Sequence, residues 1–343
     1  MKGDQFEEAM EQNQGAPTQQ MSTFTGLAEQ FEQSFHKRHF PAEPAALYDA
    51  SQYLLTVKGK RIRPVMCLMG NELFDSINPD AWHVAAAIEL FHHFTLIHDD
   101  IMDRAPLRRN RPTVHVEFGN STALLAGDVM LVAAYESINR ISADTIRPIL
   151  HLFNSTAKKV CEGQQLDMEF ETAPAVSFAD YERMITLKTS VLLAASLQMG
   201  AALGGAGMGN QQHLYEFGKN LGIAFQVQDD YLDAFGDPEK FGKKSGGDIV
   251  ANKKTFLLIG TLDTCSAAQQ RELMEVLAGE RDETEKVRKV TAIYKACGVD
   301  QWAKKLKQQY LSRALSSLEE VAVLSSRKKP LEGLAHYLLD REH

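Results

Sequence analysis

The chain has 343 residues, of which 44% are hydrophobic, enough to build the core of one large domain or two smaller ones. Its formal net charge of −8, without a long basic tract, argues against nucleic acid as a partner. The four cysteines lie far apart in the chain, which argues against a zinc site or a disulfide framework and fits a reducing cytosol.

Residues 1–20 are rich in glutamine, glutamate and glycine and nearly free of bulky apolar side chains. Such a segment cannot bury enough apolar surface to fold, so we expect a disordered N-terminal lead-in. Residues 21–343 are expected to form one domain. No apolar run reaches the roughly 18 residues of a membrane span, and no signal-peptide core is found at the N-terminus. We therefore expect a soluble, cytoplasmic protein with no integral membrane segment.

From about Thr23 onward, apolar residues recur at three- and four-residue spacing, as within residues 85–97, which is the period of a helix. No Asn-Gly or Asp-Gly pair joins alternating strands, so a sheet is not expected. After Pro174 only Pro238 and Pro330 interrupt the chain, which leaves two long stretches without a helix breaker. The earlier prolines are expected to mark loops or helix starts: Pro64, Pro79, Pro106, Pro112, Pro148 and Pro174. The pattern predicts an all-α single domain.

Three carboxylates interrupt an apolar helical stretch in the segment LIHDDIMD at residues 96–103. On a helix Asp99 and Asp103 lie almost one above the other, with Asp100 about a quarter-turn away. The segment VQDDYLD at residues 227–233 repeats this spacing. Like charges on one turn repel each other, and a divalent cation removes that penalty. Oxygen ligands without sulfur or imidazole favour Mg²⁺, which a protein often shares with substrate phosphates.

Basic clusters accompany the acidic ones. KGKRIRP at residues 58–64 gathers four cations before a proline that can open a helix, where backbone N–H groups also attract anions. APLRRNRPT at residues 105–113 follows the first acidic motif, and FGKKSGGDIVANKKT at residues 241–255 follows the second. One acidic motif or one lysine-rich loop is often only a solvated surface. Here a basic cluster follows an acidic motif twice, which indicates a phosphorylated substrate bound through metal ions on one side and cations on the other.

Together with GQQLD at residues 163–167 and LKT at residues 187–189, these motifs resemble the trans-isoprenyl diphosphate synthases, the family of farnesyl and geranylgeranyl diphosphate synthases. The resemblance runs in order from about Gln52 to Lys254. It implies an all-α bundle around a deep central cavity (the isoprenoid synthase fold), usually as a homodimer. The implied reaction is the condensation of isopentenyl diphosphate with an allylic diphosphate (dimethylallyl, geranyl or farnesyl), with Mg²⁺ as the cofactor.

The resemblance also assigns roles to residues that match the family's motifs. Asp99, Asp103 and Asp229 are the expected Mg²⁺ ligands, and Asp100, Asp230 and Asp233 are expected to support them directly or through water. The expected cations on the allylic diphosphate are Arg108, Lys188, Lys243 and Lys253. The expected isopentenyl diphosphate site consists of Lys60, Arg63, His92 and Arg109. Thr189 and Gln226 are expected to place oxygens near the developing carbocation, with Phe225 against the isopentenyl group and Asp167 near Lys188.

The implied chemistry needs no protein nucleophile. Cations neutralise the leaving diphosphate, the allylic C–O bond ionises, and the double bond of isopentenyl diphosphate attacks the allylic cation. A proton is then lost, and the departed diphosphate is the plausible base. In the family, product length depends on residues one to three turns before the first aspartate. Here Thr95 is small and leaves room, while Phe94 is the candidate floor. This favours a twenty-carbon product over a fifteen-carbon one.

Three alternatives remain. A farnesyl diphosphate synthase differs only in product length. A terpene cyclase generally replaces the second acidic motif and lacks the GKRIRP cluster, and a non-catalytic subunit tends to lose aspartates. The second acidic motif, the GKRIRP cluster and all six aspartates of the two acidic motifs are present here. One departure from the family is Asn110, where glycine is common, in the loop that carries Arg108 and Arg109.

Overall fold

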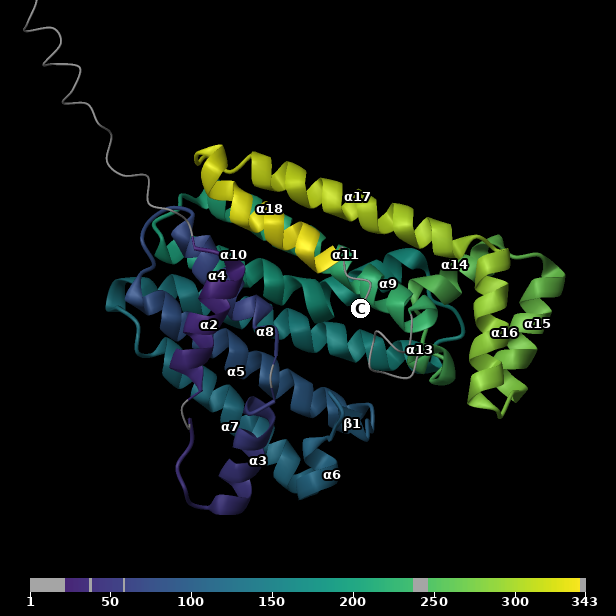
Figure 1. The fold of residues 1–343 in the computed structure, drawn as a ribbon. Coiled ribbons are helices and arrows are strands. Elements are labelled where there is room, and N and C mark those ends of the chain that lie inside the picture. The colour runs from purple at the N-terminus through teal and green to yellow at the C-terminus, as the bar shows by residue number, and fades with distance from the viewer. Residues whose placement is uncertain (1–21, 37–38, 58, 237–245, 340–343) are drawn as a thin grey trace, which may run out of the picture.

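A computed structural model describes residues 22–36, 39–57, 59–236 and 246–339 (Figure 1). The lead-in expected at residues 1–20 and the expected ligand Lys243 lie outside these ranges. The elements of the first half are α2 (Phe24–Phe35), α3 (Ala45–Leu55), α4 (Ile62–Glu72), α5 (Pro79–Met102), β1 (Leu107–Arg108), β2 (Arg111–Pro112), α6 (Val114–Phe118), α7 (Asn120–Ile138) and α8 (Ala143–Thr172). Those of the second half are α9 (Phe178–Ile185), the π-helix η1 (Thr186–Ser190), α10 (Val191–Leu203), α11 (Met208–Phe235), α13 (Gly247–Val250), α14 (Phe256–Thr264), α15 (Ala267–Gly279), α16 (Glu283–Ala296), α17 (Val299–Glu319) and α18 (Ser325–Leu339).

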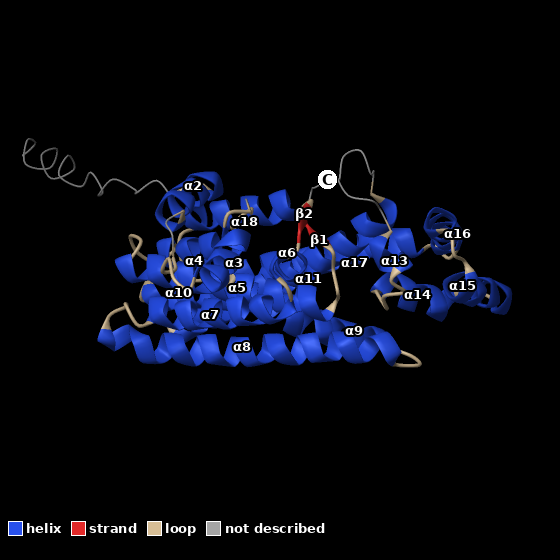
Figure 2. Ribbon diagram, turned by 90° about the horizontal axis from the view of Figure 1, so that it is seen from below, coloured by secondary structure: helices blue, strands red, loops and turns tan. Residues whose placement is uncertain are grey.

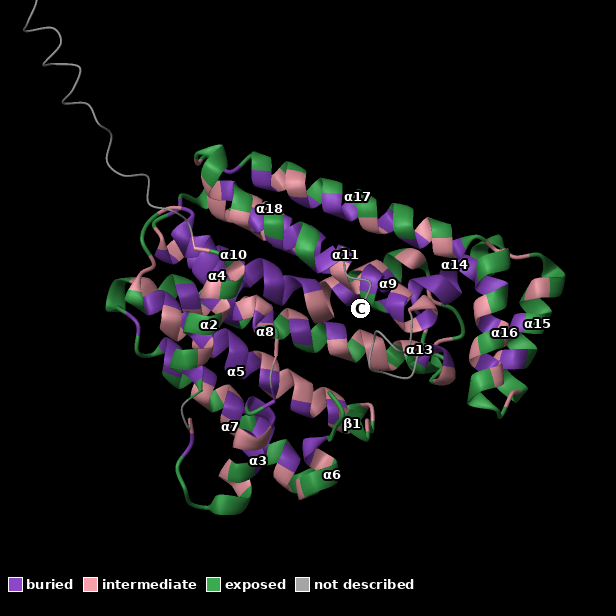
Figure 3. Ribbon diagram, in the orientation of Figure 1, coloured by how far each residue is buried: buried purple, intermediate pink, exposed green. Residues whose placement is uncertain are grey.

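Helix α10 is the centre of the bundle. All of its residues except Ala202 are buried, and it packs against α4, α5, α8 and α11 (Figure 3). A helix that is apolar on every side can only be stable when other helices surround it. Apart from Ser196 and Gln198, the stretch VLLAASLQMGAAL is apolar, which explains why this segment lies innermost. The all-α prediction is confirmed.

Three long helices, α5, α8 and α11, surround this centre, and α17 and α18 pack against α11. In Figure 2, α8 extends along one side of the bundle, and the pair α15 and α16 projects at one end. At about 1.5 Å per residue, the 24 to 30 residues of the long helices span roughly 36–45 Å. They are long enough to carry groups from the apolar core to its rim.

The proline predictions are mostly confirmed. Pro79 is the first residue of α5, where the Asn78 side chain accepts a hydrogen bond from the Asp80 N–H, and Pro174 follows the end of α8. There are two exceptions: Pro112 lies in strand β2, and Pro148 lies inside α8 rather than at its start. Packing of α8 against the bundle outweighs the one backbone hydrogen bond that this proline removes.

The expectation that no strand would form needs a small correction. Strands β1 and β2 form a two-residue antiparallel hairpin directly after the first acidic motif, with Leu107 opposite Pro112 and Arg108 opposite Arg111. Arg109 and Asn110 between them have φ of 51° and 61°. Two successive left-handed residues define a type I′ turn, in which asparagine is well tolerated. Asn110 therefore fits this turn without a glycine.

The expectation that no segment is long and apolar enough to span a membrane also needs a correction. Two helical segments in the described chain are long and apolar enough to cross a membrane, namely Asn120–Ile138 and Phe178–Leu203. The second contains α10, and 78% of its apolar window is buried inside the bundle, as expected of a core helix. The first is α7, whose window is only 44% buried. Its exposed apolar face needs a separate explanation.

Candidate active site

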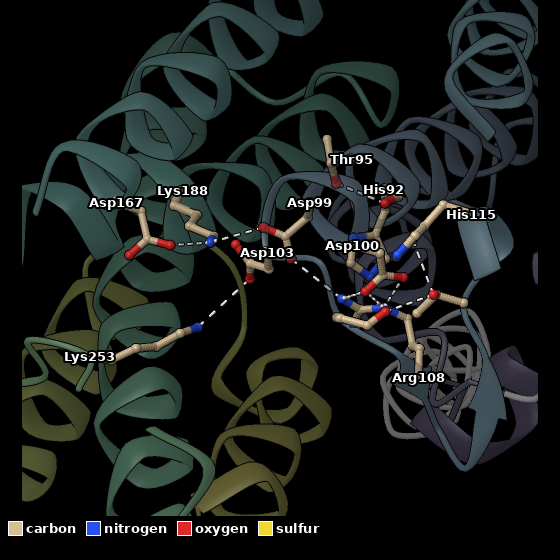
Figure 4. Close-up of polar contacts among 12 residues, drawn as sticks. His92, Thr95, Asp99, Asp100, Asp103, Arg108, His115, Asp167, Lys188 and Lys253 are labelled. Atoms are coloured by element: carbon tan, nitrogen blue, oxygen red, sulfur yellow. Dashed lines mark hydrogen bonds and ion pairs between the residues drawn. The ribbon is translucent and has the colours of Figure 1, made fainter. Parts of the chain in front are cut away.

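The centre of the site is a chain of ion pairs between three helical segments. Lys188 on η1 donates a hydrogen bond to Asp167 on α8 at 2.6 Å and lies 3.0 Å from Oδ1 of Asp99 on α5 (Figure 4). Burial opposes the charge on Lys188, but Asp99 and Asp167 outweigh it and raise its pKa. The Asp99 contact has ion-pair distance without hydrogen-bond alignment, so that Oδ1 remains a buried oxygen without a hydrogen bond. Lys188 therefore holds Asp99 by charge rather than by an aligned hydrogen bond.

A local distortion presents Lys188 and Thr189 to this site. They lie within the π-helix η1, and π-type turns inside helices are frequent at functional sites because they re-aim side chains. Gly163 on α8 allows the close approach of η1, since a Cβ there would lie 2.2 Å from the Lys188 backbone nitrogen. This explains why glycine begins the GQQLD motif.

Arg108 fixes the middle aspartate of the first motif. Its Nε lies 2.9 and 2.8 Å from the two oxygens of Asp100, and its Nη2 reaches Asp99 at 3.4 Å. Burial raises the pKa of Asp100, and the bonds from Arg108 counteract that shift. Asp100 therefore holds Arg108 beside Asp99, on the rim where the sequence predicts a diphosphate.

The segment after the second acidic motif closes the other side of the site. Lys253 lies 3.8 Å from Asp103, and Asp233 accepts a hydrogen bond from the Asp248 N–H at 3.0 Å. Asp248 was not singled out from the sequence. Burial and the neighbouring Asp233 raise its pKa to about 6. Lys254 donates to two carbonyls at the end of α8, which fastens this segment to the bundle.

The second motif also contains a buried network. Gln226 donates to Asp230 at 2.8 Å, and Thr189 donates to the Gln226 side-chain oxygen at 3.3 Å. Tyr181 on α9 donates to the other oxygen of Asp230. Burial raises the pKa of Asp230, whereas these two donors favour its charged form. The predicted neighbours Thr189 and Gln226 are thus brought together, with Tyr181 as an addition that no motif signalled.

The residues expected to bind isopentenyl diphosphate partly converge. Arg63 donates to Nε2 of His92 at 3.2 Å, so His92 is a neutral acceptor there. Burial, with Arg63 next in importance, lowers the pKa of His92 well below its usual range. Burial lowers the pKa of Arg63 to about 10, and Arg109 contributes to this shift. Arg109 also packs against Gly59, which precedes Lys60.

One cation of the KGKRIRP cluster does not join this site. Arg61 is buried and donates to Glu32 at 2.7 Å and Glu89 at 2.6 Å. Its φ of 49° is a left-handed conformation at the N-cap of α4, and it directs the side chain into the protein. Two carboxylates neutralise the buried guanidinium, so this arginine ties α2 and α5 together rather than binding a substrate.

Two cavities meet at Lys188 and Thr189, which line both. The larger, about 520 Å³, is polar and is lined by Asp103, Asp167, Gln226, Asp248 and Lys253 among others. The other, about 260 Å³, extends between α5 and α8 and is mostly apolar. Its lining includes Phe94, Thr95, His98, Val160, Gln164 and Leu192. The site therefore joins a charged chamber to an apolar pocket, as a molecule with a diphosphate head and a hydrocarbon tail requires.

Some predicted residues are placed less directly. Phe225 packs against the apolar core and lines neither of these two cavities. Within the described ranges, no three acidic, histidine or cysteine side chains are grouped closely enough to hold a metal ion on their own. The walls contributed by α8 and α10 were not predicted. Their apolar residues carry no motif, and they line the pocket only because the helices pack around it.

An all-α bundle in which acidic helix ends and cations surround the mouth of an apolar pocket defines an enzyme for a phosphorylated hydrocarbon substrate. The profile of the family described as polyprenyl synthetase matches residues 44–296, and the chain belongs to that family. It is an isoprenyl diphosphate synthase, a prenyltransferase, which confirms the resemblance seen in its motifs.

Similar proteins match this chain along almost its full length. The chain is 38% identical to the short chain isoprenyl diphosphate synthase of Methanothermobacter thermautotrophicus over 88% of this chain and 92% of that protein. It is 35% identical to the geranylgeranyl diphosphate synthase of Sulfolobus acidocaldarius, over 89% and 94%. A crystal structure of a geranylgeranyl pyrophosphate synthase superposes with a TM-score of 0.89 at 40% identity, covering 94% of this chain and all of that one.

Proposed function

We propose that this prenyltransferase adds isopentenyl diphosphate to allylic diphosphates and releases geranylgeranyl diphosphate, a twenty-carbon product. The observation that carries the proposal is the apolar pocket directly below Asp99, lined by Thr95 and Phe94. Thr95 leaves space one turn below the aspartate, and the Phe94 ring lies further along. The names of the Sulfolobus relative and of the superposed structure support the same product. Farnesyl diphosphate, one unit shorter, is the alternative product.

Prenyltransferases of this family generally use Mg²⁺. We propose that Asp99 and Asp103 from α5 and Asp229 from α11 bind it, supported by Asp100, Asp230 and Asp233. The donor set fits, because it is all oxygen and because Oδ1 of Asp99 has no hydrogen bond. When bound, Mg²⁺ would neutralise charge on the leaving diphosphate. Arg108 would hold Asp100 in place while keeping its own charge on the rim.

The protein's own residues then account for most of the mechanism. Lys188 and Lys253 place two positive charges beside Asp99 and Asp103, where the allylic diphosphate would leave. Arg63 and His92 would orient isopentenyl diphosphate, with Lys60, Arg109 and Phe225 completing that site. Thr189 and Gln226 would turn oxygen atoms toward the carbocation. Preorganised charges of this kind stabilise the transition state most where water is excluded. Lys243 belongs to the same proposal, although it lies outside the described residues.

We further propose a homodimer formed through α7. Leu124, Leu125 and Val132 on this helix are between 50% and 57% exposed, and Tyr135 is 38% exposed. Their spacing places them along one side of the helix, while the other side packs on α3 and α5. This apolar face, interrupted by the exposed Asp128, is typical of a protein contact, and a second copy would cover it. We also propose a cytoplasmic location.

Product analysis tests the proposal. Purified protein is incubated with Mg²⁺, isopentenyl diphosphate and, separately, dimethylallyl, geranyl or farnesyl diphosphate, and product lengths are measured by mass spectrometry. A twenty-carbon diphosphate is expected. A fifteen-carbon product would support the alternative, and a cyclised hydrocarbon or no elongation would overturn the proposal.

A further inference from the structure

A buried tyrosine outside both acidic motifs reaches the second one. Tyr181 on α9 is 2% exposed, and its hydroxyl donates a hydrogen bond to Oδ2 of Asp230. The start of α9 is fixed by a reciprocal capping pair between Ser177 and Asp180, and the tyrosine ring packs against Phe256 with 6.1 Å between ring centres. The capped start of α9 and the contact with Phe256 therefore both fix the position of the Tyr181 hydroxyl.

The other oxygen of Asp230 is also occupied. It accepts a hydrogen bond from Nε2 of Gln226, one turn earlier on α11, at 2.8 Å. An amide has one donating and one accepting end. Because the donating end faces Asp230, the accepting oxygen of Gln226 faces Thr189 and the polar cavity. The orientation of this amide thus depends on the carboxylate beside it.

That orientation determines the sign of the amide dipole at the reaction centre. A carbonyl oxygen aimed at a developing carbocation stabilises it, whereas an amide NH₂ group in the same place would oppose it. Both oxygens of Asp230 are bonded to protein donors, whereas Asp229, about 100° away around α11, is the proposed metal ligand. Two neighbouring carboxylates would then have different tasks.

We propose that Tyr181 and Asp230 are positioning residues that fix the Gln226 amide with its oxygen toward the allylic carbon. This inference rests on the prenyl-transfer function proposed above and extends it to a residue that no motif contains. Tyr181 holds Asp230 in its conformation, Asp230 holds the amide, and only Gln226 touches the reacting atoms.

The first test is Tyr181→Phe, which removes the hydroxyl and keeps the ring in the core. The single-turnover rate should fall about 10- to 100-fold, the usual effect of losing a group that orients an active-site ligand. The KM for isopentenyl diphosphate and the Mg²⁺ concentration for half-maximal rate should stay within about twofold of wild type. Asp229→Asn is the matched comparison, because it should raise the Mg²⁺ requirement.

A double-mutant cycle separates positioning from general damage to the fold. If Tyr181 acts through Gln226, Tyr181→Phe should cost little or nothing in a Gln226→Leu background. Losses that multiply would overturn the proposal, as would a Tyr181→Phe enzyme with the Mg²⁺ dependence of Asp229→Asn. If Tyr181→Phe fails to fold, Asp230→Asn tests the same chain of contacts: a rate loss that disappears in the Gln226→Leu background supports the proposal, and a loss that multiplies overturns it. A wild-type chain that makes no product would instead remove the proposed function itself.

Discussion

Replacing Phe94 by alanine should lengthen the product by one five-carbon unit. The Phe94 ring lines the apolar pocket, and behind it lies Phe91, which is 1% exposed and only 5.6 Å away between ring centres. Phe91 is held in turn by Phe153 at 5.3 Å. Removing the Phe94 ring therefore deepens the pocket, and the Phe91 ring remains as its new floor.

The free energy gained by burying one more five-carbon unit favours a clear change in product length. Burying five more carbons at about 0.8 kcal/mol each is worth at most about 4 kcal/mol. Since about 1.4 kcal/mol corresponds to a factor of ten, this limit is close to a thousandfold in favour of one further elongation over release. The cost to stability should stay below the roughly 3–5 kcal/mol of a fully buried phenylalanine, because Phe94 is only partly buried.

The assay is the product distribution by mass spectrometry at fixed substrate concentrations. Phe94→Ala should give mainly a twenty-five-carbon diphosphate, and Thr95→Phe should shorten the product to fifteen carbons. Phe178→Ala is the matched control, because it removes a half-buried ring that packs on Trp302 away from both cavities and should leave products unchanged. An unaltered distribution for Phe94→Ala would refute the assignment of the floor and move it to Phe91.

Three further predictions concern metal binding, acid stability and assembly. Asp99→Ala should lower turnover by at least about 100-fold with normal helicity by circular dichroism, and near-normal turnover would contradict its proposed role. His92 should lower the free energy of unfolding as pH drops below about 6.5, because the unfolded chain protonates it and the folded chain resists protonation. His39 and His93, whose pKa burial also lowers, act in the same direction, and the raised pKa of Asp248 acts against them. His92→Gln should flatten that fall in denaturant titrations at pH 7.5 and 5.5, and an unchanged difference would refute this origin. Leu125→Glu should yield monomers in analytical ultracentrifugation while Met274→Glu on α15 should not, and dimers in both would place the interface elsewhere.

The acidic and basic motifs were predictable from the sequence because their chemistry is local. Asp99 and Asp103 share a helix face through their four-residue spacing alone. The ordered motifs were specific enough to identify the family.

Other features required side chains from distant segments to meet. Arg61 and Arg63 are two residues apart in one basic cluster, yet Arg61 turns inward to Glu32 and Glu89 while Arg63 faces His92. A left-handed backbone at Arg61 separates their directions, and no composition or spacing signals it.

The sequence by itself determined the all-α fold and the charged groups around a diphosphate, because helical period and charge spacing are local properties. Tertiary structure decided what these groups touch. Lys188 reaches Asp99 only because Gly163 lets η1 approach α8, and Tyr181 reaches Asp230 across 49 residues of chain. Such contacts depend on how closely helices pack, and packing is a property of the whole bundle rather than of any segment.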